Sequence, residues 1–351
     1  MSDTVVIVGA SLAGATAAHT LRTEGFEGTV VLVGAEAHLP YERPPLSKDY
    51  LQGKAERSDA FVHAQDWYTD NDVDLRLATT VTTLDLAGGQ VVTGAGDRIR
   101  FDTLLLCTGS TPRTLPVPGA DLAGVHYLRT VEDSDRIRAA FGESGDVVVI
   151  GAGWIGLEAA AAAREAGRRV TVLESAELPL LRVLGSEMAQ VFADLHREHD
   201  VDLRFGVTVS EIVGDGAVSA VRLSDGTDVP AGVVVVGIGI DPVTGLAADA
   251  GLQVDNGVVT DEHLRTSDRR VYAAGDVASA LHPAIGKHIR VEHWANAQRQ
   301  GELAAKSILG QDVSDDRPPY FFTDQYDLGM EYTGYVEPGG YDDVVVRGDT
   351  A

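Results

Sequence analysis

The chain of 351 residues contains a single cysteine, Cys107. One thiol cannot form an intramolecular disulfide, a CxxC redox pair or a thiolate zinc site. The 10 histidines show no metal-binding spacing such as HExxH, so we expect no metal centre. Any redox chemistry must therefore depend on a bound organic cofactor.

Basic residues are scarce, because 28 lysines and arginines face 53 aspartates and glutamates, for a formal net charge of −25. A field of this sign repels nucleic-acid phosphates and anionic lipid head groups. We therefore expect neither nucleic-acid nor membrane-surface binding.

Long hydrophobic runs are also missing. The first ten residues, MSDTVVIVGA, lack the basic region of a signal peptide. The longest later run, residues 231–240, is far shorter than the ~20 residues that span a bilayer. These absences predict a cytoplasmic protein.

Glycine is abundant, with 39 residues, and it marks an internal repeat. The segment TVVIVGASLAG at residues 4–14 recurs as VVVIGAGWIG at residues 147–156. In each copy an apolar, β-branched run, typical of a buried parallel strand, leads into a glycine turn. A stretch of small helix formers follows and ends at Gly25 or Gly167, each suited to a helix C-terminus. The repeat predicts two βαβ units and parallel sheets.

The two halves also end alike, because FDTLLLCTGSTP and AGVVVVGIGIDP are both strands that lead to a glycine and then a proline. At roughly 150 residues per domain, the length fits about two domains. We predict an α/β fold with two Rossmann-like dinucleotide-binding domains, the second inserted in the first. The first domain is expected at residues 1–112 and 241–315 and the second at residues 113–240, and an incomplete C-terminal α+β domain begins at residues 316–351.

The second glycine turn has the full GxGxxG pattern in the context that a dinucleotide site requires. Gly151 makes the tight turn, Gly153 lets the backbone approach a pyrophosphate, and Gly156 permits close helix–strand packing. Glu174 follows at the end of the next strand, where an acid accepts hydrogen bonds from a ribose 2′-hydroxyl and repels a 2′-phosphate. This copy therefore predicts a preference for NADH over NADPH.

The first turn departs from the pattern, with Gly9, Ser11 and Gly14 in the glycine positions. Gly34 stands where the second copy has Glu174, and Glu36 is the nearest carboxylate for a ribose contact. Two dinucleotide sites without protein thiols suggest one tightly held and one exchanging dinucleotide, the layout of a flavin enzyme that is fed by a nicotinamide. The first domain is then the expected FAD-binding domain, and the second is the expected NAD-binding domain.

Further segments carry a resemblance that covers essentially the whole chain. They are PYERPPLSKDYL (40–51), LRTVEDSDRIR (128–138), VYAAGDVA (271–278), VEHWANAQRQG (291–301) and FFTDQYDLGMEYTGY (321–335). Together with the glycine turns, they resemble the NADH-dependent, FAD-containing ferredoxin reductases, the family of putidaredoxin reductase, rubredoxin reductase and the reductase components of aromatic-ring dioxygenases.

The resemblance implies roles for individual residues. Lys48 would lie near the flavin ring and stabilise its reduced form, Glu158 would face the nicotinamide carboxamide and pair with Lys48, and Trp294 would lie beside the flavin. Asp276 would hold the ribityl and pyrophosphate region from a helix N-terminus. The expected FAD-binding residues are Gly9, Ser11, Ala13, Gly14, Glu36, Arg43, Lys48, Val81, Arg129, Asp276 and Trp294. The expected NAD-binding residues are Gly151, Gly153, Gly156, Glu158, Glu174 and Gly239.

The implied function is that of an FAD flavoprotein that takes hydride from NADH. It would pass single electrons to a 2Fe-2S ferredoxin or a rubredoxin, which feeds an oxygenase or cytochrome P450. Lys287, His288, Arg290 and Arg299 are expected to form a positive patch that docks this acidic partner.

Several alternatives share the fold. The acceptor could instead be monodehydroascorbate, oxygen or a quinone, or the chain could resemble apoptosis-inducing factor, an interaction flavoprotein that binds DNA. The net charge of −25 disfavours the DNA-binding alternative. Disulfide reductases use cysteines beside the flavin, a role that Cys107, alone at the end of a core strand, cannot fill.

Overall fold

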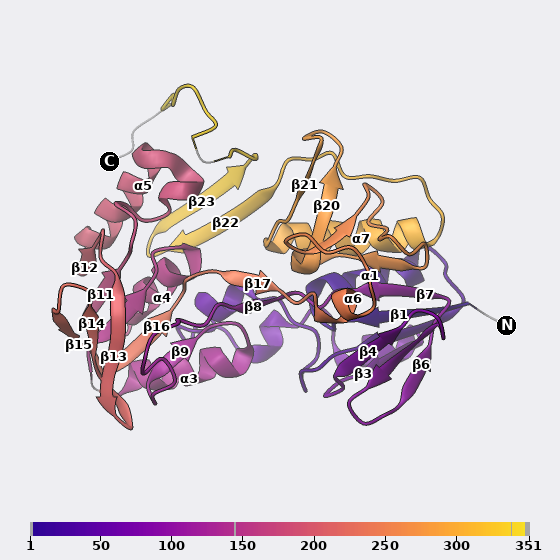
Figure 1. Ribbon diagram of the computed structural model, residues 1–351, viewed down its shortest axis with the longest axis horizontal. Helices are drawn as coiled ribbons and strands as arrows, with labels where there is room; N and C mark the ends of the chain where they lie inside the picture. The colour runs from indigo at the N-terminus through magenta and orange to yellow at the C-terminus, as the bar shows by residue number, and fades with distance from the viewer. Residues whose placement is uncertain (1–2, 144, 338, 348–351) are drawn as a thin grey trace. The chain divides into compact units, whose positions relative to one another are not determined.

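The computed structural model describes residues 3–143, 145–337 and 339–347, and it divides into two compact units (Figure 1). The first unit contains the chain up to Glu42, Ser58–Thr111 and Asp241–Phe321. The second unit contains Arg43–Arg57, Pro112–Ile240 and the segment from Phe322 onward. The chain passes from one unit to the other within β8 (Ser110–Pro112) and β17 (Ile240–Pro242).

A five-stranded parallel sheet forms the centre of the first unit, in the order β19-β7-β1-β2-β3. Its strands are β1 (Thr4–Val8), β2 (Thr29–Val33), β3 (Val73–Arg76), β7 (Thr103–Leu106) and β19 (Val271–Ala273). Runs such as VVIV in β1 and VVLV in β2 are buried on both faces, as a sheet covered by helices requires. In chain order this is the 3-2-1-4-5 arrangement of a dinucleotide-binding fold.

Two helices, α1 (Leu12–Thr23) and α7 (Trp294–Ile308), pack against each other in the first unit. A Cβ added to Gly301 would lie 2.5 Å from the Ala13 carbonyl oxygen, so only glycine allows this approach. Beyond the C-cap of α1, Gly25 has φ +84°, as the sequence predicts. The shorter helices of this unit are η2 (Arg57–Ala60, which begins at the unit boundary), α2 (Gln65–Asp70), η3 (Gly275–Val277) and α6 (Gly245–Asp249).

Two smaller sheets complete the first unit. They consist of β4 (Val81–Asp85), β5 (Gln90–Thr93) and β6 (Arg98–Arg100), and of β18 (Val258–Thr260), β20 (Ala278–His282) and β21 (Lys287–Ile289). The expected helix N-terminus at Asp276 is wrong, because Asp276 lies in the short 3-10 turn η3 that leads into β20. The backbone of β20 pairs with β18 on one side and β21 on the other, which excludes a helix there.

The second unit repeats this architecture. Its parallel sheet has the order β12-β11-β10-β16-β9, formed by β9 (Val125–Tyr127), β10 (Val147–Ile150), β11 (Val170–Leu173), β12 (Val201–Arg204) and β16 (Val233–Val236). An antiparallel sheet of β13 (Val209–Asp215), β14 (Ala217–Leu223) and β15 (Asp228–Pro230) follows β12, as β4 to β6 follow β3 in the first unit. The α/β fold with two Rossmann-like sheets is therefore confirmed.

The other elements of the second unit are η1 (Pro44–Ser47), α3 (Val131–Gly142), α4 (Trp154–Glu165), α5 (Leu181–Glu198), β22 (Tyr320–Gln325, which begins at the unit boundary) and β23 (Leu328–Thr333). The compact units differ from the expected domains because residues 43–57 and the segment from Phe322 belong here. The η1 turn packs on α3 and α4, and the Ser134 hydroxyl donates a hydrogen bond to the Leu46 carbonyl at 2.8 Å.

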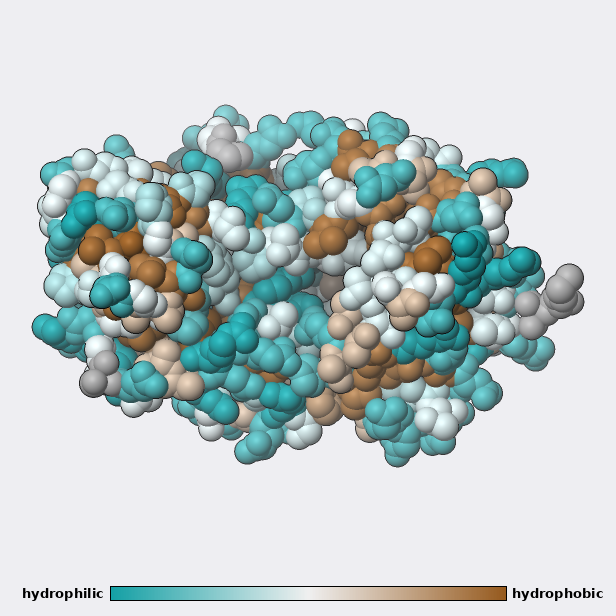
Figure 2. All heavy atoms as spheres, turned by 60° about the horizontal axis from the view of Figure 1, so that its bottom comes forward, coloured by the Kyte–Doolittle hydropathy of each residue, from teal (hydrophilic) through white to brown (hydrophobic). Residues whose placement is uncertain are grey.

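The face drawn in Figure 2 is largely hydrophilic, with its hydrophobic residues gathered in separate patches. Among the helices of the described residues, none is both long enough and apolar enough to cross a membrane.

Candidate active site

The glycine turn between β10 and α4 has the geometry of a phosphate-binding turn. Gly151 has φ +99°, a conformation that favours glycine. A Cβ on Gly156 would lie 2.0 Å from the Gly151 carbonyl oxygen, so this glycine lets the helix close onto the turn. A Cβ on Gly153, in contrast, would have no atom within 4 Å. The open side of the turn at Gly153, at the helix N-terminus, therefore fits an approaching pyrophosphate.

Glu174 lies directly after β11, beside this turn. Its carboxylate accepts hydrogen bonds from the backbone N–H groups of Ala152 (2.7 Å) and Ala176 (2.8 Å). These bonds fix the carboxylate beside the turn, at the strand end where dinucleotide-binding folds place an acid. Gly239 follows β16 with φ +104° in the same unit.

Two substitutions in this turn separate folding from dinucleotide binding. Gly156→Ala is expected to lower the free energy of unfolding by about 3 kcal/mol, because its methyl group would overlap a carbonyl oxygen. Gly153→Ser keeps a good helix N-cap at φ −80° and should leave stability unchanged. Its side chain would crowd the phosphate and weaken NADH binding about tenfold. Urea unfolding and NADH titration measure the two effects, and equal stability of the two variants would contradict the prediction.

The first turn is built in the same way from β1 and α1. Gly9 has φ +118°, and a Cβ on Gly14 would lie 2.1 Å from the Gly9 carbonyl oxygen. Ser11 is the N-cap of α1. A Cβ on Gly34 would lie 2.6 Å from the Ala10 Cβ, which explains why no acid stands at this position. Glu36 is half-buried and accepts a hydrogen bond from the Tyr41 hydroxyl.

Four more of the expected FAD-binding residues belong to the first unit. Ala13 is buried in α1, Val81 is buried at the start of β4, Asp276 lies in η3, and Trp294 begins α7. Near Trp294, burial raises the pKa of Glu42, and the Trp294 side chain opposes this with a hydrogen bond.

Arg43, Lys48 and Arg129 belong to the second unit. The Arg43 guanidinium donates a hydrogen bond to the Arg129 carbonyl. Arg129 precedes α3, whose N-cap Thr130 forms a capping box with Asp133. The Asp133 carboxylate also accepts from the Arg129 N–H at 3.0 Å, so the capping box fixes the backbone at this residue.

A buried ion pair joins Lys48 to Glu158 on α4, with 2.6 Å between Nζ and Oε1. The side chains are 14% and 3% exposed, respectively. The Ser47 hydroxyl donates to Oε2, and the Thr323 hydroxyl donates to Oε1 at 2.6 Å. The structure thus brings together two residues that the resemblance paired and adds Ser47 and Thr323, which the sequence analysis did not identify.

Thr323 connects this ion pair to a buried polar cluster. The Gln325 amide donates to the Thr323 hydroxyl at 3.2 Å and accepts from His196 Nε2 at 2.8 Å. The Tyr326 hydroxyl lies 3.2 Å from His196 Nδ1, and the Tyr326 ring stacks on His199 with centroids 3.6 Å apart. Only the motif FFTDQYDLGMEYTGY pointed to this segment, and no spacing in it shows which helices the strand meets.

His196 makes the stability of the protein depend on pH. Burial lowers the pKa of His196 from 6.5 to about 4. Between these two pH values the histidine of the unfolded chain is protonated, whereas that of the folded chain stays neutral. Stability is therefore complete above pH 6.5 and decreases towards pH 4, by about 2 kcal/mol from this residue at pH 4.5. Urea unfolding at pH 7 and pH 4.5 should show that His196→Gln loses less stability than the unaltered protein, and parallel losses would contradict this.

The expected positive patch is wrong at Arg290. The Arg290 side chain is 8% exposed, forms an ion pair with Glu292 and donates to the Asp276 carbonyl at 3.4 Å. Arg299 donates to the Pro318 carbonyl at 3.0 Å. Lys287 and His288 on β21 are exposed, so a partner can reach them.

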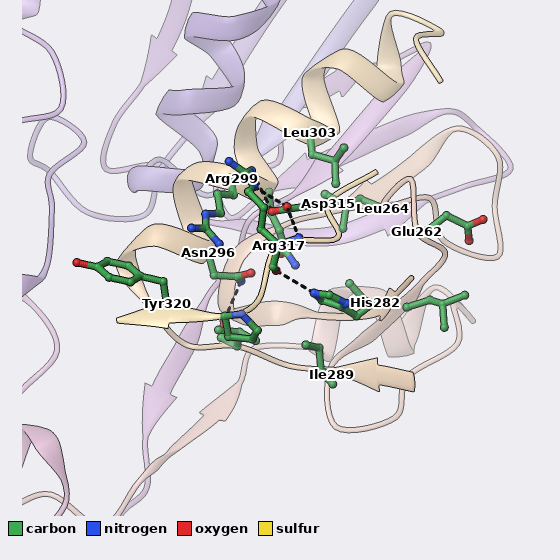
Figure 3. A pocket seen from close by; sticks show the side chains of 15 residues that line it. Glu262, Leu264, His282, Ile289, Asn296, Arg299, Leu303, Asp315, Arg317 and Tyr320 are labelled. Carbon is green, nitrogen blue, oxygen red and sulfur yellow. Dashed lines mark hydrogen bonds and ion pairs between the residues drawn. The ribbon is translucent and has the colours of Figure 1, made fainter. Parts of the chain in front are cut away.

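A pocket in the first unit lies between α7, β20 and the chain that precedes β22 (Figure 3). Figure 3 shows Arg317 between Asp315, with which it forms an ion pair at 2.7 Å, and His282, which bonds its carbonyl at 3.0 Å. Asn296 donates to the Val291 carbonyl at 2.9 Å. The cavity of about 40 Å³ has room for a few waters. The polar groups named above already bond to other groups of the protein. We therefore assign it no ligand.

Cys107 is 6% exposed, and burial raises the pKa of its thiol, so the thiol is unreactive. Among the described residues, no cluster of three or more histidine, cysteine, aspartate or glutamate side chains could hold a metal ion.

Comparison with known proteins identifies the family. Residues 3–301 match the family described as pyridine nucleotide-disulphide oxidoreductase. The chain belongs to this family. This membership confirms the expected class of oxidoreductase and fits the two Rossmann-like sheets, and the relatives described next confirm the resemblance to ferredoxin reductases.

Two relatives and one solved structure are similar to this oxidoreductase over nearly its whole length. Putidaredoxin reductase of Pseudomonas putida is 40% identical, over 100% of this chain and 84% of the relative. The ferredoxin–NAD(+) reductase component of the anthranilate 1,2-dioxygenase system of Burkholderia cepacia is 39% identical, over 100% of this chain and 86% of the relative. The crystal structure of a covalent putidaredoxin reductase–putidaredoxin complex matches with a TM-score of 0.95 and 39% identity, over 99% of this chain and 84% of that one.

Proposed function

We propose that this protein is an FAD-containing NADH:ferredoxin reductase that supplies electrons to an oxygenase. The observation that carries the proposal is the pair of dinucleotide-binding turns, one with Glu174 beside it, in a chain whose one thiol is buried. The similarity to reductases of putidaredoxin and of a dioxygenase ferredoxin supports the choice of acceptor. We place the reaction in the cytoplasm, where NADH is regenerated.

The turn at Gly9, Ser11 and Gly14 fits FAD, and the turn at Gly151 to Gly156 fits NADH. Gly153 is open to the pyrophosphate, and Glu174 is fixed by two backbone N–H groups to receive the ribose hydroxyls. Bound FAD would supply the conversion of a two-electron hydride donor into single electrons. The protein's own contribution is to orient the two ring systems and to exclude water.

Lys48 and Glu158 are the groups we assign to the reacting rings. The Lys48 ammonium is a fixed cation that favours negative charge developing beside it. Glu158 holds this ammonium at 2.6 Å, and its carboxylate would face the carboxamide of a bound nicotinamide. Arg43, Arg129, Asp276, Val81 and Trp294 complete the proposed FAD contacts.

The partner is an iron–sulfur protein of the ferredoxin or rubredoxin class. Because the reductase carries a net charge of −25, docking of an acidic ferredoxin requires a local positive surface. Lys287 and His288 on β21 are exposed and are the proposed contacts, without the buried Arg290.

An anaerobic titration with NADH, followed by visible absorption, tests the proposal. The purified protein should show flavin bands that bleach with about one NADH per flavin. Addition of a ferredoxin and cytochrome c should then give NADH-dependent cytochrome reduction. Bleaching by NADH without any transfer to ferredoxin or rubredoxin would instead indicate a quinone, monodehydroascorbate or oxygen as acceptor, and absent flavin binding would overturn the proposal.

A further inference from the structure

We propose that Thr323 is a positioning residue of the active site, whose hydroxyl fixes the Glu158 carboxylate in front of Lys48. Gln325 and His196 in turn fix Thr323. The inference rests on the proposed function only in assigning Lys48 and Glu158 to the reacting rings. The residues involved all belong to the second unit, and Figure 1 shows the β22–β23 hairpin beside α5, which carries His196.

The hydrogen bonds of the cluster run in one direction. Burial lowers the pKa of His196 to about 4, so the ring is neutral at pH 7. Because the Gln325 carbonyl oxygen can only accept, His196 carries its proton on Nε2. His196 Nδ1 then accepts from the Tyr326 hydroxyl.

From the histidine, donors point step by step towards the carboxylate. The Gln325 amide N–H donates to the Thr323 oxygen, and the Thr323 hydroxyl donates to Glu158 Oε1. Each donor in this series has an acceptor, and hydrogen bonds in series strengthen one another by polarisation. Thr323 and Gln325 are each 1% exposed and His196 is 0% exposed, so water does not compete for these bonds.

The hydrogen-bond acceptor positions of the Glu158 carboxylate show what these donors achieve. A carboxylate offers about four acceptor positions, two on each oxygen. Lys48 and Thr323 fill those of Oε1, and Ser47 takes one of Oε2. One position on Oε2 remains, which suits one N–H of a substrate carboxamide. Lys48 alone could be satisfied by several rotations of the carboxylate, whereas donors on both oxygens fix its plane.

Tyr326, at the other end of this series of hydrogen bonds, is also fixed in place. Tyr326 has φ 56°, which is unfavourable for a residue with a bulky side chain. Its ring stacks on His199 with an interplanar angle of 9°, and its hydroxyl bonds His196. The turn between β22 and β23 therefore anchors the strand that carries Thr323.

The test compares Thr323→Val, which keeps the shape and removes the hydroxyl, with Thr323→Ser, which keeps the hydroxyl. In the FAD-loaded protein, anaerobic stopped-flow reduction by NADH should be about tenfold slower for Thr323→Val and near the unaltered rate for Thr323→Ser. The flavin content of both variants should stay close to that of the unaltered protein. The thermal midpoint should fall by a few degrees in Thr323→Val, which loses two buried hydrogen bonds, and stay nearly unchanged in Thr323→Ser. Gln325→Met should give a smaller loss of rate in the same direction.

A second readout does not depend on catalysis. Acetylation of Lys48 by acetic anhydride, followed by mass spectrometry, should be several-fold faster in Thr323→Val, because the ammonium must leave its carboxylate before it can react. Lys54, which is 56% exposed, is the internal reference. Unchanged Lys48 acetylation and reduction rates in Thr323→Val would overturn the inference. A protein that never oxidises NADH but shows the acetylation difference would overturn the proposed function and leave the positioning of Lys48 supported.

Discussion

Replacement of Lys48 with methionine is expected to lower the free energy of unfolding by about 4 kcal/mol, because it leaves the Glu158 charge buried without its counterion. Glu158 is 3% exposed, and after the change only the Ser47 and Thr323 hydroxyls would face it. Hydroxyl groups compensate a buried charge less well than an ammonium does. Urea unfolding, followed by circular dichroism, measures the loss.

The double variant Lys48→Met, Glu158→Gln tests whether the instability of Lys48→Met comes from the unpaired charge of Glu158. A neutral amide can accept from Thr323 and donate to Ser47, so stability should return to within about 1 kcal/mol of the unaltered protein. Reduction by NADH should remain slow in this variant, because both proposed ring-facing groups are gone. If the double variant lost as much stability as the sum of the losses in the single variants Lys48→Met and Glu158→Gln, the unpaired charge would not be the source of the instability.

Replacement of Glu174 with arginine is expected to change the ratio of kcat/KM for NADH and NADPH by about 10³-fold in favour of NADPH. The variant exchanges a charge that repels a 2′-phosphate for one that binds it. It also loses the hydrogen bonds from the Ala152 and Ala176 N–H groups, which hold the acid at 2.7 and 2.8 Å. We therefore expect most of the change to come from weaker use of NADH.

Glu177→Arg is the matched control for this experiment. Glu177 lies three residues later on the exposed side of the same loop, so the variant changes the net charge equally. Its coenzyme ratio should stay within about twofold of the unaltered protein, as for a solvent-screened surface charge. Equal ratios for the two variants would show that Glu174 does not face the ribose.

The glycine turns were predictable because their causes are local. A run such as VVVI is apolar on both faces, and a Cβ on Gly156 or Gly14 would overlap the carbonyl oxygen at the start of its turn. The structure places strands at Thr29–Val33 and Val170–Leu173, where they close the two predicted βαβ units. The repeat of these features in two halves was enough to predict both sheets.

The predictions that were wrong concerned residues whose structure depends on segments that pack against them in the fold. The resemblance implied a helix N-terminus at Asp276, yet the segment that follows it is β20, which pairs with β18 and β21. Arg290 was expected in a positive surface patch because it lies close in sequence to Lys287 and His288, yet its side chain is held inside by Glu292 and the Asp276 carbonyl. Sequence spacing contains no information on which partner a charged side chain finds.

The sequence by itself determined the two Rossmann-like folds, the absence of a dithiol and the place of Glu174 at the end of its strand, because these follow from short-range sterics and from composition. Only the tertiary structure decided the surroundings of Glu158. Its partners Lys48 and Thr323 lie 110 and 165 positions away in the chain. Such contacts form when separate segments pack together, and burial then makes each of their hydrogen bonds necessary.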